Sequence, residues 1–245
     1  MFRSSLSLML FSLVLASAAA AQEQSPPDVV KTSAGDLVIT FIGHGSLLFT
    51  FGGKTIYVDP YSKLADYAKL PKADVILITH EHRDHLDPVA IEKVRTEKTT
   101  IVLTEASAGR VSGGMVMNNG DVKAINGMTV EAVPAYNIVS KRENGQPYHP
   151  KGVGNGYIIT FGDKRVYVAG DTENIPEMKS LKNIDIAFLP MNLPYTMTPE
   201  MVADAASMIR PKVLYSYHTG DTDIAKLIAL MKDRKDTEVR IRNMK

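Results

Sequence analysis

Apolar residues fall in short runs along most of the chain, each four to seven residues long and ended by glycine, proline or aspartate. The runs are rich in β-branched and aromatic residues, which is typical of β-strands. We therefore expect strands at 37–42, 47–51, 55–58, 75–79, 157–161, 165–169, 184–189 and 212–217.

Three other segments have apolar residues spaced for a helix. An Asp-Pro pair at 87–88 and a Thr-Pro pair at 198–199 each provide a cap and a first turn. Helices over 88–95 and 199–209 should follow these pairs, and a third over 222–234 places its apolar residues on one stripe. This mixture of strands and helices predicts an α/β fold.

The chain also carries an internal echo. TFGGKTIYV at 50–58 and TFGDKRVYV at 160–168 agree at six of nine positions, and each contains a pair of residues suited to a hairpin turn. Either two halves share the same ββ unit, or unrelated hairpins have converged on similar turns. A duplicated architecture predicts two facing sheets with helices outside, and a site along the edge that the sheets share.

Residues 1–21 form a distinct N-terminal segment, with Arg3, an apolar run over 6–15, and then alanines. This is the pattern of a secretory signal peptide cleaved after Ala18 or Ala21. The apolar run is too short to span about 30 Å of hydrocarbon, and no cysteine follows it to carry a lipid anchor. We expect an exported protein, periplasmic or secreted, without membrane attachment after cleavage.

The remaining chain has the composition of one globular domain. Residues 22–36 are polar and contain prolines, and we interpret them as a leader before a single domain over 37–245. Over the whole chain, 28 Lys and Arg residues balance 27 Asp and Glu residues without forming a basic stripe, which argues against a nucleic-acid partner. Nothing in the sequence indicates the oligomeric state.

Three of the chain's six histidines lie in the segment LITHEHRDHLD at 77–87. His80 and His82 are two positions apart, so in an extended segment they point to the same side and can share one cation. Asp84 and His85 then turn the chain toward the next helix and can reach a second position. Because the chain has no cysteine, nitrogen and oxygen must hold any metal, and this set suits Zn, Mn or Fe.

Two more predicted strands run into a polar residue of the same kind. RVYVAGD ends at Asp171 and KVLYSYH ends at His218. Strand ends suit metal ligands because the strand is rigid while the loop leaves a face open to substrate. Taken alone, Asp171 is better interpreted as a residue that caps a helix or turn at Thr172 than as a metal ligand.

The motifs together resemble a known superfamily. THEHRDHLD is similar to the metal motif of the metallo-β-lactamase-fold hydrolases, and AGDT (169–172) and YHTG (217–220) are similar to their bridging-aspartate and last-histidine motifs. FIGHGSLLF (41–49), VDP (58–60) and GYIITFGDKRVYVAGDTENIPEM (156–178) resemble the branch that contains ascorbate-6-phosphate lactonase and N-acylphosphatidylethanolamine phospholipase D. The resemblance spans 37 to about 220 and implies an αββα sandwich of two mixed β-sheets with outer helices.

The resemblance also implies a site for two divalent metal ions, with zinc as first choice and manganese or iron as alternatives. Carried over by position, it assigns His80 and His82 to the first metal, assigns Asp84, His85 and His218 to the second, and makes Asp171 the bridge between them.

The third ligand of the first metal departs from the family pattern. Family members place a histidine a few residues after a proline-ended strand, but here VEAVPAYNIVSK has Asn137 near that position and the next histidine is His149. Neutral imidazole binds zinc better than an amide oxygen does, so we favour His149. We expect His149→Ala to weaken the first metal site and Asn137→Ala to change metal content little. The alternative is a surface His149, with Asn137 or water completing the shell.

These observations predict a metal-dependent hydrolase that uses a metal-bound hydroxide on a small-molecule substrate. Asp84 would orient the hydroxide, and His44, in a Gly-His-Gly loop, would either assist catalysis or only hydrogen-bond the turn. We favour a lactone or carboxylic ester over a phosphodiester as the substrate, by analogy with the lactonase named above. The alternative class is a non-catalytic metal- or ligand-binding periplasmic protein.

Two details refine this prediction. Leu86-Asp87-Pro88 stands where thiol hydrolases and true β-lactamases have paired glycines, which counts against both activities. Tyr195, close to Asn192, has the chemistry to stabilise negative charge, but we expect it to pack in the interior.

Overall fold

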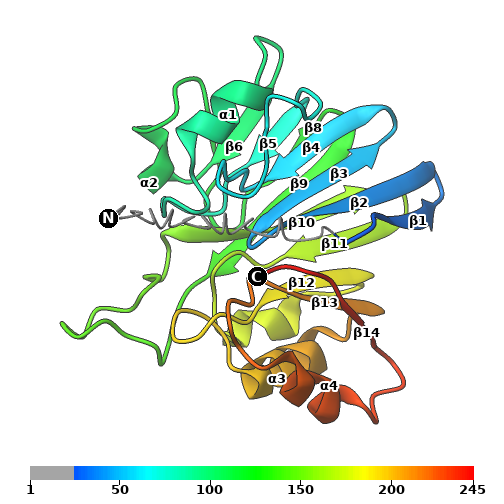
Figure 1. The fold of residues 1–245 in the computed structure, drawn as a ribbon, viewed down its shortest axis with the longest axis vertical. Coiled ribbons are helices and arrows are strands. Elements are labelled where there is room, and N and C mark those ends of the chain that lie inside the picture. The colour runs from blue at the N-terminus through cyan, green and yellow to red at the C-terminus, as the bar shows by residue number, and fades with distance from the viewer. Residues whose placement is uncertain (1–24) are drawn as a thin grey trace, which may run out of the picture.

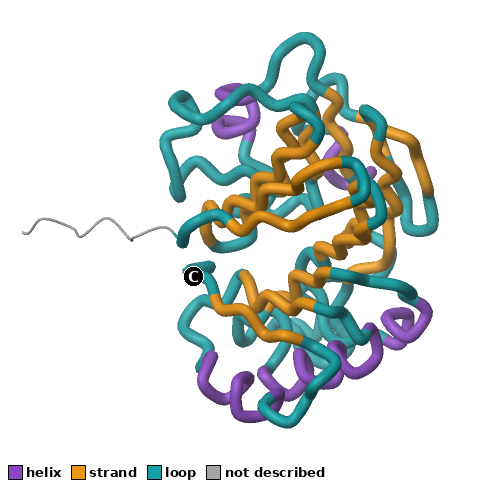
Figure 2. Tube along the Cα trace, turned by 90° about the vertical axis from the view of Figure 1, so that its right-hand side faces the viewer, coloured by secondary structure: helices purple, strands orange, loops and turns teal. Residues whose placement is uncertain are grey.

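The structure, a computed structural model, describes residues 25–245. The predicted signal peptide lies outside these residues. Two β-sheets face each other with helices on their outer sides (Figure 1), and the view turned by 90° shows the two layers of strands edge-on (Figure 2). The predicted αββα sandwich is confirmed.

The first sheet contains seven strands in chain order, antiparallel from β1 to β4 and parallel from β4 to β7. They are β1 (Asp28–Thr32), β2 (Gly35–Gly43), β3 (Ser46–Phe51), β4 (Lys54–Val58), β5 (Val75–Leu77), β6 (Thr100–Leu103) and β7 (Met115–Val116).

The second sheet repeats this plan, antiparallel from β8 to β11 and parallel from β11 to β14. Its strands are β8 (Val122–Ile125), β9 (Met128–Ala135), β10 (Gly154–Phe161), β11 (Lys164–Val168), β12 (Ile186–Pro190), β13 (Val213–Tyr217) and β14 (Glu238–Ile241). The echo at 50–58 and 160–168 therefore marks the hairpin between the third and fourth strands of each half.

Two of the helices begin at the residues that the sequence indicated. α1 (Pro88–Val94) is capped by the Asp87 carboxylate, which accepts from the Val89 amide. α3 (Pro199–Ile209) is capped by the Thr198 hydroxyl. The third predicted helix is shorter than expected, because the Asp223 carboxylate caps α4 (Ile224–Met231) and starts it two residues later. The short α2 (Glu105–Ala108) and the 3-10 turn η1 (Pro176–Ser180) were not predicted.

The main core lies between the sheets and is aromatic at its centre. Phe188 stacks on Tyr215 with ring centroids 4.9 Å apart, and Phe41 contacts both rings. All three side chains are fully buried. Two smaller apolar clusters lie under the helices on either outer face. Burying a large apolar side chain contributes about 1.5 to 3 kcal/mol, so the aromatic layer fixes the two sheets against each other.

Strand β1 lies within residues 22–36, where the sequence predicts a leader and no strand. It pairs with β2 along its whole length. Only alternate residues are partly buried, so the segment shows no apolar run. The Asp28 carboxylate accepts from Arg242 at 2.6 and 2.7 Å. This ion pair ties the edge of the first sheet to the segment after β14. Within residues 25–245, no helix is long and apolar enough to cross a membrane.

Candidate metal centre

The predicted site residues gather at one end of the sandwich, where parallel strands of both sheets finish. The loop from His80 to His85 follows β5, Asp171 follows β11 and His218 follows β13. Inside the first loop, the amide of His85 donates to the His82 carbonyl at 3.1 Å. This turn folds the motif into a compact group instead of a continuing strand.

Three histidines form the first cluster. His80, His82 and His149 each offer a ring nitrogen, and the three atoms lie within 4.8 Å of one another. His149 comes from the long loop between β9 and β10, and its Nε2 is 3.2 Å from Nδ1 of His82. The structure therefore brings together two histidines of the motif and the distant histidine favoured by the sequence.

Asn137 lies behind His149. Its Oδ1 accepts from Nδ1 of His149 at 2.6 Å and from the His149 amide at 2.9 Å. Its Nδ2 donates to Glu173 and to the carbonyl of Tyr195. With its oxygen turned to His149 in this way, Asn137 positions the imidazole and leaves Nε2 of His149 free on the side of the cluster.

Four residues form the second cluster: His44, Asp84, His85 and His218. Oδ2 of Asp84 lies 2.9 Å from Nε2 of His44, 3.5 Å from Nε2 of His218 and 3.6 Å from Nε2 of His85. His85 and His218 are buried, whereas the Asp84 side chain is about one-third exposed (36%). Asp84 is therefore the member of this cluster that faces solvent.

Asp171 lies between the clusters and offers one oxygen to each. Oδ2 is 3.2 Å from Nε2 of His149 and 3.9 Å from Nε2 of His80. Oδ1 is 3.5 Å from Nε2 of His85 and 3.7 Å from Nε2 of His218. This is the placement that a bridging carboxylate requires.

The atoms that point into the centre are short of partners. Among residues 25–245, Nε2 of His80, Nε2 of His85, Oδ1 of Asp171 and both ring nitrogens of His218 are buried without a hydrogen-bond partner. Leaving one such group unsatisfied costs about 1 to 3 kcal/mol. Cations coordinated by nitrogen and oxygen would satisfy the atoms that converge here, so the residues fit the metals that the sequence suggested.

A second layer of contacts orients the histidines. The fully buried Asp59 accepts from Nδ1 of His85 at 2.8 Å and from the amide and hydroxyl of Thr79. The Thr79 hydroxyl also lies 2.9 Å from Nδ1 of His80. Such partners fix which ring nitrogen is free to bind. In the sequence, Asp59 follows the first hairpin as Asp171 follows the second, but no role in the centre was predicted for it. Its echo of Asp171 in the other half was the available signal.

The electrostatics of the centre favour positive charge. Burial lowers the pKa of His85, but the carboxylates of Asp171, Asp59 and Asp84 outweigh burial and raise that pKa to about 10. For Asp171, burial acts in the other direction and raises the pKa. The neighbouring histidines, of which His218 has the largest effect, outweigh burial and hold the pKa of Asp171 well below its usual range. The buried Asp171 carboxylate thus stays ionised and requires compensating positive charge nearby.

His44 is held by a tight backbone arrangement. Its φ of 49° is left-handed, and a Cβ on Gly45 would lie 2.9 Å from the His85 ring, so only glycine fits there. The His44 ring packs on His218 with centroids 3.7 Å apart. The His44 amide donates to the Lys245 carbonyl, and its own carbonyl accepts from the His218 amide. His44 is therefore part of the second cluster and does more than close a turn.

The centre opens into a cavity of about 420 Å³. Tyr195 lies on its wall and is 45% exposed, so the expected interior packing is wrong. The Tyr195 amide donates to the Asn192 carbonyl, and the resulting turn sets the ring against Tyr148 with centroids 5.0 Å apart. The cavity lining comprises His82, Arg83, Asp84, Arg142, Tyr148, His149, Asp171, Asn192, Tyr195 and His218.

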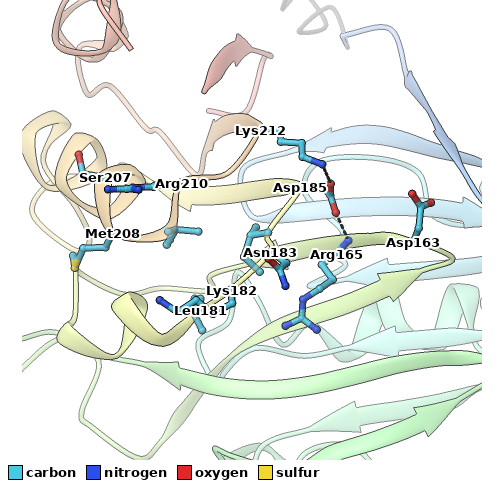
Figure 3. A pocket seen from close by; sticks show the side chains of 12 residues that line it. Asp163, Arg165, Leu181, Lys182, Asn183, Asp185, Ser207, Met208, Arg210 and Lys212 are labelled. Atoms are coloured by element: carbon cyan, nitrogen blue, oxygen red, sulfur yellow. Dashed lines mark hydrogen bonds and ion pairs between the residues drawn. The ribbon is translucent and has the colours of Figure 1, made fainter. Parts of the chain in front are cut away.

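A larger hollow of about 980 Å³ lies at the opposite ends of β11, β12 and β13 (Figure 3). Its lining contains no histidine. Asp185 there accepts from Lys212 at 2.7 Å and from the Arg165 amide at 2.9 Å. With its carboxylate paired in this way and no candidate ligand present, this hollow lacks the chemistry of the centre.

Known proteins that are similar to this chain in sequence or structure are described as metal-dependent hydrolases or members of the beta-lactamase superfamily. A sequence profile of the beta-lactamase superfamily domain matches residues 38–218. A protein of Pelotomaculum thermopropionicum named a metal-dependent hydrolase is 30% identical over 190 residues, covering 74% of this chain and 83% of that protein. A candidate metal-dependent hydrolase from Parabacteroides distasonis has a crystal structure with TM-score 0.86 and 53% identity, covering 90% of this chain and 99% of that one. A metallo hydrolase from Ignicoccus hospitalis gives TM-score 0.68 and 25% identity, covering 84% and 94%.

Proposed function

The chain belongs to the beta-lactamase superfamily and is a metal-dependent hydrolase of the metallo-β-lactamase fold, and from this premise we propose that it cleaves a lactone or carboxylic ester of a small molecule. The observation that carries the proposal is the set of buried, partnerless ligand atoms at the floor of an open cavity. A site that only stored metal would not need the adjoining space for a substrate.

We assign the first metal, preferably zinc, to His80, His82 and His149, and the second to Asp84, His85 and His218, with Asp171 shared. A divalent ion in such a site lowers the pKa of a coordinated water from about 16 to about 7, which supplies a hydroxide nucleophile at neutral pH. No Ser or Cys nucleophile is then required, which agrees with the absence of cysteine from the chain.

The chain's own proton-handling group is the pair of Asp84 and His44. Asp84 lines the cavity, and the opposing histidines keep its pKa below the usual range although burial acts to raise it. It is therefore ionised and can accept a hydrogen bond from a water molecule in the cavity. Burial lowers the pKa of His44, so the ring is neutral at pH 7 and donates Nε2–H to Asp84. We propose that Asp84 orients the attacking water and that His44 holds the Asp84 carboxylate in place through this hydrogen bond.

The preference for a carbonyl centre over phosphorus is supported by the resemblance to ascorbate-6-phosphate lactonase. A phosphodiester is the competing substrate class. The test uses protein loaded in turn with zinc, manganese or iron, against aliphatic lactones, p-nitrophenyl esters and bis(p-nitrophenyl) phosphate.

Two carboxylate variants sharpen this test. Asp84→Asn should reduce kcat/KM for the lactone or ester by about 100- to 10,000-fold. Asp66→Asn, which removes an exposed ion pair with Lys69 in a neighbouring loop, should leave it unchanged. Faster turnover of the phosphodiester would replace the proposed substrate class, and no turnover of any compound by fully loaded protein would reject hydrolysis of these bonds.

A further inference from the structure

Two arginines line the cavity beside the candidate metal centre. Arg83 lies between the motif residues His82 and Asp84, and Arg142 comes from the loop between β9 and β10. Both side chains belong to exposed residues. Within the described part of the chain, neither guanidinium has a carboxylate within ion-pair distance. Arg142 makes one long hydrogen bond, of 3.4 Å, to the Tyr148 carbonyl.

The acids of the cavity cannot serve as their partners. The only carboxylates in the lining are Asp84 and Asp171. Both lie within 3.7 Å of two or more histidine nitrogens and belong to the candidate metal centre. The cavity therefore offers two guanidinium groups whose forked donors match a carboxylate or a phosphate.

Arg142 is presented by a supported hairpin and does not hang from a loose loop. The Arg142 amide donates to Gln146 at 2.7 Å, and its carbonyl accepts from Gly145 at 2.9 Å. At the base of the hairpin, the buried Glu173 carboxylate accepts from three consecutive amides at residues 138–140. In Figure 1 this loop projects beyond the body of the sandwich. Its root is anchored, so the hairpin can hold a side chain over the cavity.

An aromatic pair lies next to the guanidinium. The Arg142 guanidinium is 5.1 Å from the ring centroid of Tyr148, which packs edge-on against Tyr195. Cation–π contact restrains the arginine, and the two rings, at 81° to each other, form an aromatic part of the cavity wall beside it. A substrate on this wall would place one end at the metals and the other at the arginines.

We propose that the substrate is an anion, with a carboxylate or phosphate group held by Arg83 and Arg142 at a distance from the bond that is cleaved. This inference rests on the proposed hydrolytic function and names its substrate class. A charge-assisted hydrogen bond to a fixed anion is worth about 10- to 100-fold in affinity. Each arginine should contribute on that scale.

Equilibrium titration tests the proposal without relying on catalysis. Three ligands share one carboxylate and differ only at the far end: pentanoate with a methyl group, glutarate with a carboxylate, and phosphonobutyrate with a phosphonate. Each is titrated calorimetrically into the metal-loaded protein. We expect the two doubly anionic ligands to bind at least about 10-fold more tightly than pentanoate, and the order of the two identifies the preferred anion.

Substitutions of the two arginines test whether they cause the tighter binding of the doubly anionic ligands. Arg83→Gln and Arg142→Gln should each reduce it by about 10-fold or more and leave pentanoate affinity and metal content unchanged. Lys141→Gln, an exposed change next to Arg142 in the same hairpin, is the matched control and should behave as wild type. Hydrolysis of p-nitrophenyl pentanoate and mono-p-nitrophenyl glutarate should show the same pattern in kcat/KM.

The outcomes separate the two proposals. Equal affinity for all three ligands, an advantage that survives both arginine substitutions, or no binding of any ligand would overturn the anionic substrate class. Arginine-dependent binding in a protein that hydrolyses neither ester would instead retain the anion site and reject the proposed reaction.

Discussion

The contact between His149 and Asn137 allows a sharp test of the first metal site. Oδ1 of Asn137 accepts from both Nδ1 and the amide of His149, so the ring proton is fixed on Nδ1 and Nε2 is free to bind a cation. From the sequence we expected Asn137→Ala to change metal content little. The geometry revises this expectation, because the substitution leaves the ring free to turn or to change tautomer.

The two variants should differ in magnitude. Removing an outer partner of a metal-bound histidine costs about 10- to 100-fold in metal affinity, which is our expectation for Asn137→Ala. His149→Ala removes the ligand itself, so its loss should reach up to about 1,000-fold, or about 4 kcal/mol. Asn137→Ala should also reduce stability by about 1 to 3 kcal/mol for each buried group left without a partner. One such group is the His149 amide, which is buried.

The assay is metal content by mass spectrometry after equilibration at buffered free zinc, together with competition against a chromophoric chelator. Circular dichroism establishes that each variant is folded. Lys151→Ala is the control, since Lys151 lies in the same loop as His149 and the substitution removes an exposed ion pair with Glu177 of η1. Loss of a metal from Asn137→Ala while His149→Ala keeps wild-type stoichiometry and affinity would refute the assignment of His149.

Two further predictions follow from other contacts and a third from the N-terminal sequence. Asp59→Asn should weaken the second metal site by about 10- to 100-fold, because it removes the carboxylate that orients His85; the same chelator competition, compared with Lys151→Ala, measures it. Asp28→Asn should lower the free energy of unfolding at neutral pH by about 1 to 3 kcal/mol. Burial raises the pKa of Asp28, but Arg242 and Tyr215 outweigh it and hold the pKa below its usual range. The wild-type advantage should therefore be complete above the ordinary carboxyl pKa and vanish as the pH falls through the lower folded value, and urea unfolding of both proteins between about pH 2 and 7 checks this sign. Export should remove the N-terminal segment, and N-terminal sequencing of the exported form should find one of the two alanine-ended cleavage sites; an intact N-terminus would argue against a signal peptide.

The strands that could be predicted from sequence are those that contain an apolar run bounded by turn residues. All eight predicted strands are present, among them β5 and β12, whose residues are buried throughout. β1 and β8 lie at sheet edges and show no apolar run, and β9 contains Glu131 and Pro134, which mask its pattern. β6 does contain an apolar run at 101–103 that was overlooked.

The residues of the site likewise fall into those that could be predicted from the sequence and those that could not. Residues of the THEHRDH motif are close in sequence, so their proximity follows from local geometry. The position of His149 depends on the path of the loop between β9 and β10, which no periodicity specifies. For Asp59 the available signal was its echo of Asp171, but its contact with His85 depends on the fold. Arg142 was beyond reach, since its role depends on which hairpin meets the cavity.

The placement of Asp171 between the clusters has a consequence for how the molecule stays closed. One set of ligands, from His80 to His85, belongs to the first half of the chain, whereas His149, Asp171 and His218 belong to the second. Ions held among them would act as a cross-link between distant points of a chain that has no disulfide. Closing a long loop restricts the unfolded chain and raises the free energy of unfolding. A chelator should therefore loosen one half against the other as well as stop the chemistry, and this loosening should be visible as faster hydrogen exchange in the aromatic layer between the sheets.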